Sequence, residues 1–404
     1  MKSPVAIYVV HHPECKTATA LARSLYDFFR LGYLSGDQSG AGLPVYYRRQ
    51  LVHSTIQPEI YFEGASLNVV VLLVDQIMVG DKTWRKAIVE LTKTVRRMRL
   101  NKQLDSHTLV LPVALHDSFY RMGPVYEGFN PIRLLDLSED QLAATLRRAV
   151  TEATARMVRS EGSNQPPPLN VFLSHAKRDG RQIAEYLRDA VRSFGQMEAW
   201  YDANDLPHGG DWKSPMEKAA RSDTAAMVAT VTDAYPTRPW CRKEAALART
   251  PKLLTGRGAG QVWKVQPVIA VHRPGNQWAR SIPMLEGVPS IGWDVLEPKS
   301  TTERIVDRLA LEVMLGLVHR KIAIEIARKD LNRQSACYLT WVPDSWTLAS
   351  VRQQMEEKMP RSSSKIFRIV YPGYGLTTAE ISELKSTIQS FSPETKLISF
   401  EEAM

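Results

Sequence analysis

Short runs of apolar residues alternate with longer amphipathic stretches along most of the chain. Before residue 160, runs such as VAIYVV and NVVVLLVD are too short for helices and too uniformly apolar for exposed strands. Such runs predict strands buried on both faces of a parallel sheet, with helices between them. Further strands are expected at LPVYYRR, HTLVLPVAL and IRLLDL, and helices at about 17–30, 82–98 and 139–158.

The same order of elements recurs after residue 168. A helix is expected at about 180–194, where Ile183, Leu187 and Val191 lie on one side, and a second helix at about 302–319 closes the unit. Strands are expected at NVFLSHA, MEAWYD, AAMVATVTD, VQPVIAVH and PSIGWD. Five strands interleaved with helices predict a flavodoxin-like, doubly wound parallel sheet. The tail shows another, shorter α/β pattern.

A proline-rich segment, SEGSNQPPPLN, separates these two α/β patterns. Three consecutive prolines exclude a helix, lack donors for a sheet and favour an extended spacer. We therefore expect an N-terminal α/β domain at 1–159 that is TIR-like or flavodoxin-like, a linker at 160–168, a flavodoxin-like domain at 169–320 and a small C-terminal α/β module at 321–404.

Composition indicates a globular protein of the cytoplasm. The 404 residues are 44% hydrophobic and 24% charged, and no run reaches the roughly 18 apolar residues that a membrane span needs. The first apolar run breaks at His11, His12 and Pro13, too early for a secretory leader. Three widely separated cysteines form neither a disulfide framework nor a metal motif, so no metal is expected.

The formal net charge of +9 would suit an anionic partner such as a nucleotide or a nucleic acid. The basic residues, however, are scattered through the expected helices as RRMR, RKD and LRRAV. This distribution favours solvated helix faces, and nucleic acid stays an alternative partner.

Three polar blocks follow successive strands of the second α/β pattern. Ser174–Lys177 follows the first strand, the loop 203–211 follows the second, and Trp240 and Glu244 follow the third. Ligands of open parallel sheets bind outside the carboxyl ends of the strands, so the blocks converge on one rim. Trp240 and Glu244 are four residues apart and therefore share a helix face. Alternatively, Trp240 packs on the sheet edge, and Glu244 caps its helix or is solvated on the surface.

Together these blocks resemble a bacterial Toll/interleukin-1 receptor (TIR) domain. The resemblance rests on VFLSHAKRDG, AWYDANDLPHGGDW, ARSDTAAMVATVTDAYPTRPWCRKEAALA and PSIGWD, which occur in the order of the family. It implies an NAD⁺ nucleosidase that cleaves the nicotinamide–ribose bond, giving nicotinamide and ADP-ribose or a cyclic variant. NAD⁺ would be the substrate, and no cofactor is implied.

The resemblance also implies roles for single residues. Glu244 matches the catalytic glutamate, which would stabilise an oxocarbenium-like transition state, and Trp240 matches an aromatic residue beside the nicotinamide ribose. A structural histidine, a solvated lysine and a turn-forming aspartate are the alternatives for three of the remaining positions. The further substrate-binding positions are Ser174, His175, Ala176, Lys177, Asp205 and Ser222.

The loop after the second strand resembles the one through which TIR domains stack. Its residues are Asn204, Leu206, Pro207, Gly209 and Gly210. The resemblance implies a homo-oligomer or filament, activated by assembly in a prokaryotic antiviral defence setting, with an activating partner or signal that the sequence does not reveal. The alternative function is a non-catalytic TIR scaffold that mediates homotypic assembly.

The N-terminal domain repeats part of the third block. Aligning Arg85-Lys86 of VVVLLVDQIMVGDKTWRKAIVEL on Arg242-Lys243 places Ala87 at the position of Glu244. The domain is therefore interpreted as a degenerate TIR-like module with a regulatory or assembly role, although strand–loop–helix units of any doubly wound fold resemble one another. Its segment HHPEC is expected to form a turn.

Overall fold

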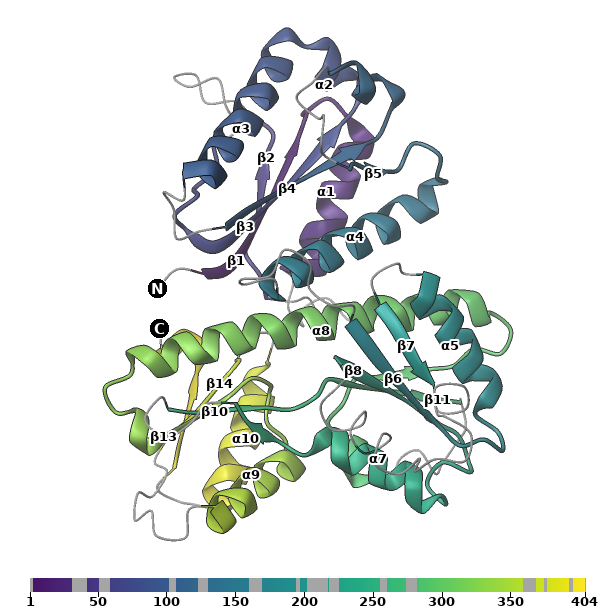
Figure 1. Cartoon of the computed structure of the whole chain (residues 1–404), viewed down its shortest axis with the longest axis vertical. Coiled ribbons are helices and arrows are strands. Elements are labelled where there is room, and N and C mark those ends of the chain that lie inside the picture. Colours follow the sequence, from purple (N-terminus) through teal and green to yellow (C-terminus); the bar gives the residue numbers. More distant parts are fainter. Residues whose placement is uncertain are drawn as a thin grey trace. The chain divides into compact units, whose positions relative to one another are not determined.

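The computed structural model describes most of the chain as two compact units, which divide near residue 164 (Figure 1). Each unit is described by itself, and the expected linker at 160–168 lies outside the described residues. These residues are 3–30, 42–50, 59–101, 107–122, 130–159, 169–193, 197–201, 217, 225–254, 260–273, 282–358, 368–373, 376–391 and 395–403.

The first unit contains one parallel sheet with the strand order β2-β1-β3-β4-β5. Its strands are β1 (Ser3–His11), β2 (Val45–Arg48), β3 (Ala65–Val74), β4 (His107–Ala114) and β5 (Ile132–Arg133). Figure 1 shows α1 (Lys16–Phe29) and α4 (Glu139–Arg159) on one face and α2 (Gln76–Gly80) and α3 (Lys82–Asn101) on the other. A short 3-10 helix, η2 (Asp117–Arg121), follows β4. Nearly every position of β1 and β3 is buried, as the uniformly apolar runs predict.

The second unit begins with a parallel sheet of the order β12-β11-β8-β6-β7. Its strands are β6 (Leu169–His175), β7 (Met197–Tyr201), β8 (Ala226–Val231), β11 (Val268–His272) and β12 (Ser290–Gly292). Numbered within their own sheets, the strands of both units follow the order 2-1-3-4-5 of flavodoxin-like folds. The predicted doubly wound sheets are thus confirmed.

Helices cover this second sheet on both faces. The face that carries α5 (Arg181–Ser193) and α8 (Pro298–Lys329) is opposite the face that carries α7 (Pro239–Arg249) and η6 (Pro283–Leu285). Under α7 the core combines Phe172 with small residues such as Ala229, Ala245 and Ala248, which let the helix approach the sheet closely.

A third sheet, with the order β15-β14-β13-β10-β9, completes the second unit. Its elements are β9 (Lys252–Leu253), β10 (Gln261–Lys264), η7 (Arg333–Ser335), β13 (Ala336–Leu339), α9 (Ser345–Lys358), β14 (Arg368–Tyr371), α10 (Thr378–Phe391), β15 (Lys396–Ser399) and α11 (Phe400–Ala403). All pairs in this sheet are parallel except β9 with β10.

The third sheet takes two of its strands from the middle of the flavodoxin-like domain. β9 and β10 lie between α7 and β11 in the chain, and β10 pairs with β13. The expected boundary at residue 320 falls inside α8, a single helix of 32 residues that contacts β8 and β11 of the second sheet and β10 and β13 of the third (Figure 1). Neither α8 nor any other helix in the described residues is apolar over the length that a bilayer requires.

The imidazole of His319 on α8 gives the second unit a pH-dependent stability. Desolvation lowers the pKa of His319 from 6.5 to about 4, and a hydrogen bond with the backbone of Thr340 only partly opposes this. Because the unfolded chain takes up a proton more readily below pH 6.5, stability is retained above pH 6.5 and is lost as the pH falls towards 4.

We predict that His319→Leu flattens this pH dependence. Allowing for the partial exposure of the residue, the histidine should account for about 2 kcal/mol of the stability lost between pH 6.5 and 4. Chemical denaturation at several pH values measures the difference between wild type and variant. Equal slopes in the two proteins would contradict the prediction.

Candidate functional site

Glu244 lies inside the sheet–helix interface at the carboxyl ends of β6 and β8. α7 begins at Pro239, whose missing N–H is no loss at the first helical position. One turn later Glu244 is only 3% exposed, and its Oε2 accepts a 2.5 Å hydrogen bond from Ser174 Oγ at the end of β6. The alternative of a solvated surface glutamate is therefore wrong.

Ser174 and Tyr235 form a relay of hydroxyl groups that ends on this carboxylate. Ser174 has one hydroxyl proton, which it donates to Glu244, so the 2.8 Å contact between Ser174 Oγ and the Tyr235 hydroxyl is donated by Tyr235. Burial, together with the charge of Glu244, raises the pKa of Tyr235 well above its usual value. Tyr235 therefore stays protonated and able to donate, and successive hydrogen bonds of this kind strengthen one another.

Asp179 fixes the loop that leads from β8 into α7. Its Oδ1 accepts a 2.6 Å hydrogen bond from Thr232 Oγ1, and its Oδ2 accepts a 2.9 Å bond from the backbone N–H of Ala234. The neighbouring turn requires Gly180, because a Cβ there would lie 3.2 Å from the carbonyl oxygen of Ala176. The turn after β6 thus holds the loop that carries Tyr235.

The structure separates His175 from Glu244. Side chains alternate along β6, so Ser174 faces α7 and His175 faces the opposite side of the sheet, in register with Thr230. The His175 carbonyl accepts a 3.6 Å hydrogen bond from the Cys241 thiol of α7. Through its backbone, His175 therefore helps to anchor the helix.

The remaining described candidates surround the carboxylate at different depths. Trp240 is half-buried and packs against the core under α7, with Lys243 Nζ 4.9 Å from the centre of its ring. Ala176 belongs to the same core, whereas Lys177 is exposed. Further exposed cations at the turn after β6 and at the start of α7 are Arg178, Arg238 and Arg242.

The rest of the candidate residues cannot be placed. They lie outside the described residues and comprise Asp205, Ser222, Asn204, Leu206, Pro207, Gly209 and Gly210.

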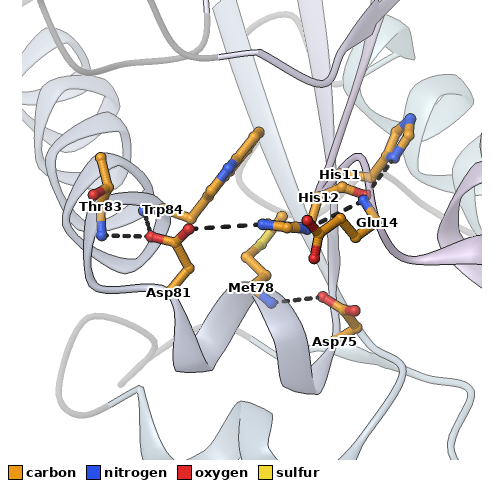
Figure 2. A network of polar contacts seen from close by, with 8 residues as sticks. All are labelled: His11, His12, Glu14, Asp75, Met78, Asp81, Thr83 and Trp84. Atoms are coloured by element: carbon orange, nitrogen blue, oxygen red, sulfur yellow. Dashed lines mark hydrogen bonds and ion pairs between the residues drawn. The ribbon is translucent and has the colours of Figure 1, made fainter.

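The corresponding edge of the first unit also gathers polar side chains, as Figure 2 shows. His12 Nε2 lies 3.8 Å from Asp81 Oδ2, while His12 Nδ1 accepts a 3.3 Å hydrogen bond from the backbone N–H of Glu14 in the expected turn. Asp75 caps α2 through the backbone N–H of Met78, at 2.9 Å. These groups are engaged in turns and helix caps.

This edge has no counterpart of the buried carboxylate at the aligned position. Ala87, which aligns with Glu244, is 1% exposed on α3, close to Trp84, whose ring lies 5.5 Å from that of His12. Within the described parts of the chain, no three His, Cys, Asp or Glu side chains are grouped so that they could hold a metal ion.

Sequence reasoning missed Tyr235 and Asp179. Both occur in the motif blocks, Asp179 directly before Gly180 and Tyr235 five residues before Trp240. The Asp-Gly pair is a turn signal that could have indicated Asp179. Tyr235 follows an apolar strand and had no pattern that distinguished it from a core residue.

Comparison with known proteins identifies a TIR domain in the second sheet. Residues 171–280 match the family model described as the TIR domain. No curated protein matches the chain. Among solved structures, one subunit of dipicolinate synthase from Bacillus halodurans is similar at 13% identity over 78% of this chain and 98% of that chain, with a TM-score of 0.17, which supports no argument. TIR domains include NAD⁺-cleaving enzymes and modules that self-associate.

We predict that Asp179→Ala destabilises the second unit by about 2 kcal/mol, because it removes two charge-assisted hydrogen bonds and leaves the N–H of Ala234 without its acceptor. Denaturant unfolding measures the change. Asp189→Ala is the control, since Asp189 is exposed on α5 and bonds only its neighbour Arg188 in the contacts described. Equal effects of the two substitutions would show that Asp179 does not hold the loop.

Proposed function

We propose that the TIR domain is an NAD⁺ nucleosidase with Glu244 as its catalytic carboxylate. The observation that supports the proposal most directly is the burial of Glu244 at the carboxyl ends of β6 and β8, where its Oε2 is held by Ser174. Strand order reverses between β6 and β8, and doubly wound sheets bind their ligands at such a point.

The chemistry needs one well-placed negative charge. When the C1′–N1 bond of NAD⁺ breaks, its electron pair returns to the nicotinamide ring, which leaves as a neutral molecule without a general acid. Positive charge then develops on the ribose, where a carboxylate withdrawn from water stabilises it strongly. Water adds to C1′ and releases a proton, which gives ADP-ribose. An internal nucleophile of the ADP-ribose would give the cyclic variant instead.

The surroundings of Glu244 suit a dinucleotide. The indole of Trp240 can lie against the ribose and the cationic ring, because an aromatic face attracts a positive charge. Lys177, Arg178 and Arg242 offer exposed positive charges to the pyrophosphate. The activity requires no cofactor, since NAD⁺ is consumed as the substrate.

Assembly is the proposed route to activation. The segment 204–210 resembles the stacking loop of the family, and copies of the chain would associate through it in the cytoplasm of a prokaryote, under the control of a partner or signal in antiviral defence. An enzyme that depletes NAD⁺ harms its own cell, so low activity of the isolated monomer is expected.

A non-catalytic scaffold is the second candidate function. The same hydrogen bond from Ser174 to Glu244 would serve a TIR domain in which the carboxylate only ties α7 to the sheet. The two functions differ in what happens to NAD⁺ when the protein is concentrated.

We predict that concentrated wild-type protein releases nicotinamide from NAD⁺, and that activity per molecule rises with protein concentration. Glu244→Gln should lower kcat by about 100-fold or more, since it removes the charge that stabilises the transition state. Glu185→Gln on α5, on the opposite face of the sheet, is the matched control and should retain activity. If wild type and Glu244→Gln are equally inert in forced assemblies, the chain is a scaffold.

We also predict that Tyr235→Phe lowers kcat by about 10-fold with little change in KM. The substitution removes the hydroxyl that donates to Ser174 but keeps the ring in the core. Ser174 would then be free to rotate, and Glu244 would lose part of its fixed position. Steady-state kinetics of the two proteins provide the measurement, and an unchanged kcat would exclude a positioning role for Tyr235.

A further inference from the structure

The helix that carries Glu244 continues almost directly into the third sheet. α7 ends at Arg249, and β9 begins only three residues later, at Lys252. β9 pairs with β10, and β10 pairs with β13 of the C-terminal module. The end of α7 is thus joined to that module by a very short connection, and any movement of the module acts on the helix.

An ion pair fastens the same end of the helix from the other side. Arg249 is only 5% exposed, and its Nη2 donates to Asp344 Oδ2 at the start of α9. Desolvation lowers the pKa of Arg249, while the charge of Asp344 opposes that shift. A buried guanidinium is strongly destabilising without its partner, so the two side chains hold each other firmly.

Asp344 is itself fixed on two sides. Its Oδ1 accepts a 2.9 Å hydrogen bond from the backbone N–H of Thr347, which caps α9. On the other side it lies against Gly287, where a Cβ would come within 3.0 Å of the Asp344 Cβ. A third contact from α9, the 2.7 Å bond from Gln354 Nε2 to the carbonyl of Pro251, holds the chain just after α7.

These contacts act on a helix of only 11 residues. Glu244 and Arg249 are five residues apart, which is about 7.5 Å along the helix axis. A helix this short moves as a rigid body, so a shift of its end is transmitted to the carboxylate. Misplacement of a reacting group by about 1 Å can cost about 100-fold in rate.

We propose that Asp344 of the C-terminal module is a positioning residue for Glu244, acting through Arg249 and α7. The module is then a working part of the TIR site. The catalytic consequence rests on the proposed nucleosidase function, whereas the effect on the helix does not. A merely structural ion pair would support the stability of the fold without controlling α7.

The chain offers a matched control for that distinction. Asp330 and Arg368 form an ion pair at 2.7 Å at the edge of the C-terminal module, with Asp330 Oδ2 also bonded to Tyr338. Asp344→Asn and Asp330→Asn each remove one negative charge from a partly buried pair in the same unit. Of the two aspartates, Asp344 is the one that contacts α7.

The first measurement is hydrogen exchange of the full-length protein. Asp344→Asn should speed exchange of the α7 amides, residues 240–248, by at least 10-fold relative to wild type, and Asp330→Asn should leave them near the wild-type rate. The proposal is overturned if both variants change α7 equally or if neither does. This measurement decides the effect on the helix even if the wild type does not cleave NAD⁺, in which case the proposed function alone is wrong.

The second measurement is the kinetics of NAD⁺ cleavage. Asp344→Asn should lower kcat by about 10- to 100-fold with KM within twofold of wild type, while Asp330→Asn retains kcat. Faster exchange in α7 without a loss of kcat would overturn the positioning role.

A pair of glycine variants guards against simple unfolding of Asp344→Asn. Gly287→Ala keeps both charges but presses on Asp344, whereas Gly292→Ala adds a methyl group to open space on β12. Gly287→Ala should reproduce the exchange and kcat changes more weakly, and Gly292→Ala should not. Identical behaviour of the two variants would count against the proposal.

Discussion

The burial of one carboxylate under a short helix constrains the rest of the TIR domain. Removing Glu244 from water costs several kcal/mol unless donors compensate the charge, and Ser174 is such a donor. Ser174 faces α7 only because β6 pairs with β8 in the observed register, with Ser174 opposite Ala229. A slip of one residue would turn the hydroxyl to the other face and leave the charge without it. The hydrogen bond therefore ties the register of the sheet, the depth of α7 and the position of the carboxylate to one another.

The two doubly wound sheets show how little of such a site belongs to the fold. Both have the same strand order, and both place polar groups at the carboxyl ends of their first and third strands. In the first unit, however, Ala87 occupies the position aligned with Glu244, and the neighbouring carboxylates Asp75 and Asp81 cap helices. A methyl group needs no donor, so this interface can pack without a buried hydroxyl relay. The pattern is that of a domain that keeps the architecture and has no use for a buried charge at this position.

The sequence predicted the elements whose signal is local. Long apolar runs such as those of β1, β3 and β8 indicated buried strands, and the motif around Trp240 placed Glu244 at the correct edge of the sheet. The short strands β9 and β10 were missed, because two to four residues show no periodicity and their pairing with β13 is a long-range event. α9 was missed although Asp344 is a good N-cap. Tyr235 and Asp179 could not be assigned a role, because a hydrogen bond between distant segments leaves no pattern in either segment.

The origin of β9 and β10 changes how the C-terminal module should be understood. A module appended after α8 could be removed without consequence for the site, but this one is built around two strands that leave and re-enter the TIR domain between α7 and β11. A fragment limited to residues 169–320 would retain β10 without β13 and Arg249 without Asp344. It would therefore present an unpaired strand edge and an uncompensated buried cation directly after the helix that carries Glu244. Inactivity of such a fragment would say nothing about the chemistry of the whole protein, because the fragment lacks the groups that hold the helix in place.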